Sequence, residues 1–128
     1  MLRNRRERGA GAVEFALVFP VLILLVLGIV EVSHLYNVQI SLSGAAREAA
    51  RVMAIEDDAS VARSAAISAA PSLNPALAAG QITITPSSCD TNPGAQVQVS
   101  IDYTASLLTN LFPAPIAVSA TGAMRCGG

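Results

Sequence analysis

The spacing of apolar positions changes twice along the chain, and each change predicts a different element. Residues Phe15 to Val30 contain no charged side chain, which predicts a helix that is apolar on all sides. From about residue 31 the apolar positions recur every three or four residues, as in a helix with one packing face. We therefore expect one continuous helix over residues 10–55, suited to a membrane in its first half and amphipathic in its second.

The packing face of the second half is a narrow seam. It consists of Leu35, Val38, Leu42, Ala45, Ala49 and Val52. Such a seam could be covered by the chain's own C-terminal region or by another subunit. Its own sheet is the expected cover, because a small isolated sheet needs a packing partner.

Three consecutive acids, Glu56, Asp57 and Asp58, end this pattern. Either aspartate can cap a second short helix that runs to about residue 70, before Pro71. The acids lack the alternation, the glycine and the distal glutamate of an EF-hand, so we predict capping rather than calcium binding. Residues 71–80 are rich in Pro, Ala and Ser and predict a connection.

In the last third of the chain the apolar period becomes two, which predicts strands. Three apolar sets alternate with polar or small residues: Ile82 and Ile84; Val97, Val99, Ile101 and Tyr103; and Ile116, Val118 and Ala120. Turn-forming residues at 86–94 and 105–115 favour antiparallel pairing. The expected fold class is α+β, a long N-terminal helix packed on a small three-stranded antiparallel sheet whose other face presents Thr, Gln and Ser.

The charges indicate an orientation. The chain has 128 residues, a net charge of −1 and eight basic residues, all Arg. Half of them precede the apolar run: Arg3, Arg5, Arg6 and Arg8. This distribution predicts a cytoplasmic N-terminus and an extracytoplasmic region after about Glu31, and it argues against nucleic-acid binding.

The apolar run covers about 24 Å as a helix, and extending it back to Ala10 gives about 31 Å, close to a bilayer core. That extension includes Glu14, which would cost roughly 2.5–3.5 kcal/mol at the membrane centre. Glu14 either marks the interface or has a function. A cleaved signal peptide would have a shorter apolar run and a small-x-small site, which Gly28 to Val32 do not offer, so we expect the helix to be retained.

Cys89 and Cys126 flank the second and third strands. Outside the cytoplasm such a pair is expected to be oxidised, with a gain of roughly 4 kcal/mol in the chain-entropy model. The alternative is two unrelated thiols, since spacing alone cannot establish a short Cα separation.

Residues for catalysis are missing from the sequence. His34 is the one histidine, and no phosphate loop or nucleophile elbow occurs. We therefore expect that the protein is not an enzyme and that it has no metal site, no cofactor site and no small-molecule substrate.

A set of local motifs resembles the TadE-like family of minor pilins, or pseudopilins, of the Tad pilus machinery. The leader-like motif is Arg8-Gly9-Ala10-Gly11-Ala12-Val13-Glu14-Phe15, followed by Phe19-Pro20, by Gly28-Ile29-Val30-Glu31 and by Gly44-Ala45-Ala46-Arg47-Glu48-Ala49-Ala50-Arg51. The resemblance implies a type IV prepilin-like leader that is cleaved after Gly9, which makes Ala10 the first mature residue. It also implies that Glu14, with Phe15, sets assembly register by pairing with the α-amino group of a neighbouring subunit.

The resemblance adds a leader to the parts that the residue patterns predict. The expected parts are a leader at 1–9, a transmembrane helix at 10–30, an extracytoplasmic amphipathic helix at 31–56, a short helix and connection at 57–80 and a β-sheet region at 81–128. The implied partners are a prepilin peptidase, other pilin or pseudopilin subunits and an assembly platform in the bacterial cytoplasmic membrane. The alternative function is an unprocessed single-pass module that binds an envelope partner.

Overall fold

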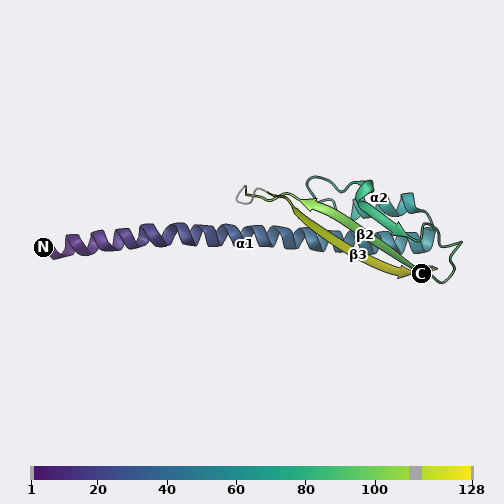
Figure 1. Ribbon diagram of the computed structural model, residues 1–128, viewed down its shortest axis with the longest axis horizontal. Helices are drawn as coiled ribbons and strands as arrows, with labels where there is room; N and C mark the ends of the chain where they lie inside the picture. The colour runs from purple at the N-terminus through teal and green to yellow at the C-terminus, as the bar shows by residue number, and fades with distance from the viewer. Residues whose placement is uncertain (1, 110–113, 128) are drawn as a thin grey trace. The chain divides into compact units, whose positions relative to one another are not determined.

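The computed structural model describes residues 2–109 and 114–127, with side chains from residue 6 onward. Its elements are α1 (Leu2–Glu56), α2 (Ala59–Ala69), the 3-10 turn η1 (Ala79–Gln81), β1 (Ile82–Thr85), β2 (Gln96–Ala105) and β3 (Ile116–Arg125) (Figure 1). These elements confirm the α+β fold class. By internal contacts the chain forms two compact units, residues 1–33 and residues 34–128.

Unit 1, residues 1–33, consists of the N-terminal part of α1. The helix begins at Leu2, earlier than the predicted start at Ala10. The reason is that Leu, Arg and Glu dominate residues 2–8 and are good helix formers, so nothing before Gly9 interrupts the helix. Pro20 lies inside the helix and leaves the carbonyl of Ala16 without its usual N–H donor.

In unit 2, residues 34–128, the predicted seam of α1 is the core of the fold. Val38, Leu42, Ala45 and Ala49 are buried, while Leu35 and Val52 are half-buried against the same cluster. The buried face is wider than the seam, because it also includes Ala46, Ala50, Met53 and Ala54. These extra positions are mostly alanines, which give little signal in a hydrophobic pattern but permit close packing.

The strands form one antiparallel sheet in the order β1-β2-β3. Every predicted inward residue of β1 and β2 is buried, from Ile82 to Tyr103. On β3 the outcome differs, because Ile116 is exposed, Val118 is half-buried and Ala120 and Gly122 are buried. The prediction of three strands is confirmed, and the apolar face of β3 lies further along the strand than its large side chains indicate.

β3 runs along α1 in the same direction. Gln39 Nε2 donates to the Ser119 carbonyl at 3.0 Å, and the Gly127 amide donates to the Ala54 carbonyl at 3.0 Å. Between these contacts Gly122 lies directly against the helix backbone. A Cβ on Gly122 would be 2.5 Å from both the carbonyl carbon and the oxygen of Ala46. The chain's own sheet therefore covers the seam, as expected.

The segments between α1 and the sheet complete the core. Asp58 is the N-cap of α2, where its side chain accepts from the amides of Ser60 and Val61, so one of the two candidate caps is confirmed. The connection at 70–81 is not merely a linker, because Leu73 and Leu77 are buried. The Tyr103 hydroxyl also donates to the Pro75 carbonyl at 2.6 Å, which fixes this connection beside β2.

The close approach at Gly122 leads to a stability prediction. We expect Gly122→Ala to destabilise unit 2 by about 1–3 kcal/mol, because the new methyl group must displace the backbone of α1 or β3. Gly44→Ala is the matched control. Its Cβ meets nothing within 4 Å, and replacing a helical glycine should stabilise by about 0.5–1 kcal/mol. Urea unfolding in detergent micelles, followed by circular dichroism, measures both, and equal stabilities would contradict the packing described.

Candidate functional site

The first candidate site is the apolar surface of α1 in unit 1. The described chain has one helix long and apolar enough to cross a membrane, and none of its most apolar stretch is buried. Its large side chains, from Val13 to Val30, are almost all exposed, and Phe15 and Phe19 stack with ring centroids 5.4 Å apart. An exposed apolar surface of this length needs lipid or another protein to cover it.

Glu14 lies within this apolar surface and its side chain is exposed. Within the described residues it takes part in neither an ion pair nor a side-chain hydrogen bond. Gly9 and Ala10 lie one turn earlier on α1 and are also exposed, so the helix itself leaves the expected cleavage position uncovered. Met1, residues 110–113, Gly128 and the side chains of residues 2–5, with Arg3 and Arg5 among them, lie outside the description.

Glu31 behaves differently from Glu14. It is 4% exposed and is the buried charged residue among those described. A buried carboxylate close to the end of an apolar helix is costly unless it is well solvated by donors.

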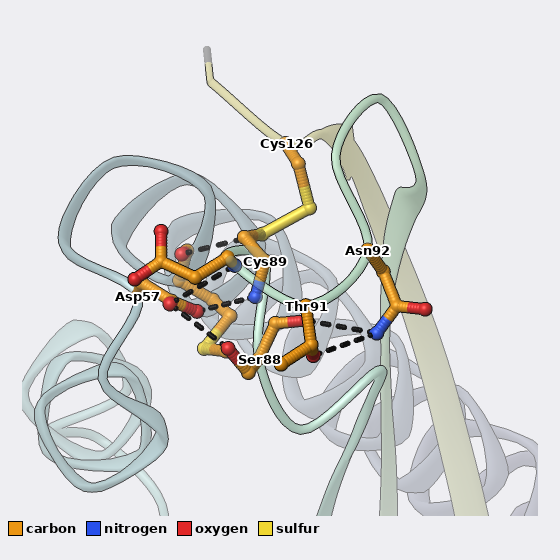
Figure 2. Close-up of a disulfide and its surroundings, with 8 residues drawn as sticks. Asp57, Ser88, Cys89, Thr91, Asn92 and Cys126 are labelled. Atoms are coloured by element: carbon orange, nitrogen blue, oxygen red, sulfur yellow. Dashed lines mark hydrogen bonds between the residues drawn. A yellow bond between two sulfur atoms is a disulfide. The ribbon is translucent and has the colours of Figure 1, made fainter.

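The second candidate site joins the end of α1 to the loop before β2. Asp57 directly follows α1 in the left-handed conformation, with a φ of 51°, and its amide donates to the Met53 carbonyl. Its carboxylate accepts from the Cys89 amide and the Ser88 hydroxyl (Figure 2). It also accepts from the Asp90 amide, at 3.2 Å. We call this arrangement, Asp57 with residues 88–90, the aspartate latch.

The disulfide lies beside the aspartate latch. Cys89 and Cys126 are bonded, with their Cα atoms 5.6 Å apart, so the predicted pairing is confirmed (Figure 2). The bond links residues separated by 37 positions, and closing such a loop contributes about 4 kcal/mol in the chain-entropy model. The aspartate latch and the disulfide together tie the end of α1, the loop before β2 and the end of β3 to one another.

The hydrogen bonds of the latch favour the ionised form of Asp57. The Cys89 amide is the main cause that lowers the pKa of this carboxyl, with further contributions from Asp90 and Ser88. The pKa of Asp58 is also lowered, chiefly by the Ser60 hydroxyl and then by the amides it caps. Both aspartates therefore stabilise the fold as carboxylates.

The described residues offer little for catalysis. They contain no group of three or more His, Cys, Asp or Glu side chains that could hold a metal ion. His34 is occupied structurally, because its Nε2 lies 3.2 Å from the Ser106 carbonyl, which only accepts, so Nε2 is the donor. A cleft of about 350 Å³ beside the disulfide has Asp57 in its wall, but that carboxylate is already engaged by the latch.

A comparison with known protein families bears on the first of these candidate sites, the apolar surface of α1. A family model described as TadE-like protein matches residues 9–51. This is a TadE-like segment. It covers about a third of the chain and includes Gly9, Glu14 and all of the packing face except Val52. The match confirms the resemblance found in the sequence and implies a structural component of Tad pilus assembly, with partners in that machinery.

No curated protein and no solved structure matches the chain. What is known of residues 52–128 therefore comes from their own sequence and structure. The sequence anticipated its disulfide and the cap at Asp58, but it missed the role of Asp57. The signal available was weak, because an acid after a helix is equally compatible with capping the next one.

The aspartate latch predicts a dependence of stability on pH. Because folding lowers the pKa of Asp57, its stabilisation is complete above the unfolded value of about 3.9 and is lost as the pH falls through the folded value. We expect Asp57→Asn to lower the free energy of unfolding at neutral pH and to weaken its decline in acid. Asparagine tolerates the left-handed backbone, so the change tests the hydrogen bonds alone.

Asp58→Asn is the matched control for this prediction. Asparagine caps helices about as well as aspartate, so the loss at neutral pH should be smaller than for Asp57→Asn. Urea unfolding at a series of pH values measures both variants. Equal losses at neutral pH would show that the latch adds nothing beyond an ordinary cap.

Proposed function

We propose that the protein is a minor pilin or pseudopilin of a Tad-type, type IV-like pilus assembly or secretion system. A prepilin peptidase removes residues 1–9, and the mature chain assembles through its N-terminal helix. The observation that carries the proposal is the TadE-like segment, because the match coincides with an apolar helix that the described chain leaves uncovered.

The exposed helix explains how one chain can serve first in a membrane and later in an assembly. Before assembly, lipid covers the side chains between residues 13 and 30. In an assembly, the same side chains pack against those of neighbouring helices, so the apolar surface stays out of water in both states. The arginines before residue 9 keep the N-terminus cytoplasmic, and unit 2 lies outside the cytoplasm, where its disulfide is stable.

Glu14 supplies the specificity of assembly. Its carboxylate is costly in the apolar environment of the span but becomes favourable when a neighbouring subunit offers the α-amino group of its Ala10. Phe15 follows it and packs on Phe19, which gives the carboxylate an apolar flank. Pairing of this kind rewards one axial stagger between helices and penalises the others.

Processing is tested by the mass of the chain extracted from membranes of cells that express the whole system. We expect the mature N-terminus to be Ala10. An intact Met1 or Leu2 would contradict processing and would favour the alternative, an unprocessed single-pass module that binds an envelope partner. Deleting the peptidase gene is the control and should restore the full mass.

The register role is tested by Glu14→Ala and the more conservative Glu14→Gln. Both should insert into the membrane at least as well as the unmodified chain, because both remove a negative charge from the apolar span. Both should lose incorporation into filaments, measured by immunoblotting of sheared surface fractions. Glu7→Gln is the control, since Glu7 is removed with the leader. Normal incorporation of Glu14→Ala would disprove the role in register.

A further inference from the structure

Among the described residues of unit 2, six large hydrophobic side chains are exposed. They are Tyr36, Ile40, Ile55, Val61, Leu108 and Ile116. Tyr36 lies two residues after the start of the unit, Leu108 follows the end of β2 by three residues, and Ile116 begins β3. We call Tyr36, Leu108 and Ile116 the proximal patch.

Hydrogen bonds and strand register place these three residues at one level of unit 2. His34 Nε2 donates to the Ser106 carbonyl, so Leu108 lies two residues from a contact with the first turn of the unit. Ile116 pairs with Ala105, the last residue of β2. Ser119 of β3 contacts Gln39 of α1. Ile116 precedes Ser119 by three residues, which is about 10 Å along the strand. The same distance along α1 corresponds to about seven residues before Gln39. Ile116 therefore lies near the level of His34.

The residues near His34 are also the part of unit 2 closest to the membrane, because the chain enters the unit directly after the apolar helix. His34 follows Glu31 by three residues in the chain, so about 11 Å is the greatest distance that the backbone can put between them. If the apolar helix ends near Val30 at the edge of the hydrocarbon, His34 and its contact at Ser106 fall within the headgroup region. The side chain of Tyr36 leans toward the helix N-terminus, which brings its ring to the same depth.

The charges of unit 2 avoid this end. Residues 32–46 and 103–124 contain no Asp, Glu, Lys or Arg. The nearest charged residues along the chain are Glu31, which is buried, Arg47, and Asp102. Asp102 lies three residues before the end of β2, about 10 Å away along the strand. A surface with an exposed tyrosine and aliphatic side chains but without charge has the composition of a membrane-interface belt.

We infer that the proximal patch of unit 2 rests in the lipid interface, with Leu108 and Ile116 against the upper acyl chains and Tyr36 at the headgroups. The partner is the phospholipid bilayer itself rather than a second copy of the chain. Such a contact fixes the depth of unit 2 before assembly and adds to the anchoring by α1. The inference depends on the membrane insertion of α1 proposed above.

The sequence contains no tryptophan, so the tryptophan fluorescence of each variant comes from the introduced residue alone. This makes a direct test possible. Leu108→Trp places the reporter in the proximal patch, and Ile55→Trp places it in the control position. The two native side chains are matched in exposure, at 61% and 62%. Leu22→Trp, within the apolar run, reports insertion of α1 independently. The full chain is reconstituted at one copy per nanodisc, with or without phospholipids brominated on the acyl chains both near the headgroup, where they reach position 108, and near the chain ends, where they reach position 22.

We expect brominated lipid to quench Leu108→Trp and Leu22→Trp several-fold more strongly than Ile55→Trp, and the emission of Leu108→Trp to be shifted to shorter wavelength. If Leu22→Trp is quenched while Leu108→Trp behaves like Ile55→Trp, the inference is overturned and anchoring stands. If Leu22→Trp is not quenched, anchoring and the inference both fail. A blue shift of Leu108→Trp that appears only with several copies per disc, without quenching, overturns the inference in favour of contact between copies.

A second reporter guards against a folding defect in Leu108→Trp. Tyr36→Trp replaces one ring by another at a side chain that is 67% exposed, and circular dichroism checks that each variant retains its structure. If Leu108→Trp is misfolded, Tyr36→Trp takes its place and the same outcomes apply. Quenching of Tyr36→Trp no greater than that of Ile55→Trp would overturn the inference.

Discussion

The fold of unit 2 depends on how closely the backbone of β3 approaches the backbone of α1. At Gly122 and Ala46 no side chain separates them, and alanines occupy most of the neighbouring helix face. Small residues bring the helix and the strand so close that Gln39 and Ala54 bond directly to the backbone of the β3 region. With few aromatic side chains in the sequence, this contact replaces the large residues that usually fill a core.

The apolar surface of α1 is covered in unit 2 but exposed in unit 1. In unit 2 the apolar face of α1 is covered by the chain's own sheet, by α2 and by the connection that contains Leu73 and Leu77. In unit 1 the side chains of the same helix remain exposed. The TadE-like segment, residues 9–51, includes both the exposed part of the helix and most of its covered face.

Most of the fold could be predicted from periodicity. The change in spacing near residue 31, the period of two in β2 and the pair of cysteines led to the long helix, the sheet and the disulfide, although the helix begins at Leu2 and not at Ala10. Gly122 could not be predicted as the closest contact, because a glycine in a strand gives no sign of what approaches it. The hydrogen bonds of Asp57 could not be predicted either, because its three donors lie about thirty residues further along the chain, in a loop without a regular pattern. Contacts of that kind depend on where the folded backbone brings a loop.

The parallel course of β3 and α1 has a mechanical consequence. The disulfide and the hydrogen bond from Gly127 to Ala54 fasten the far end of β3, and the contacts at Ser119 and Gly122 hold its middle. A force that pulls on the N-terminal end of α1 would therefore load these contacts in shear, all at once, instead of peeling them apart in succession. The helix and the sheet of unit 2 can therefore bear tension along the helix axis while the strands stay paired.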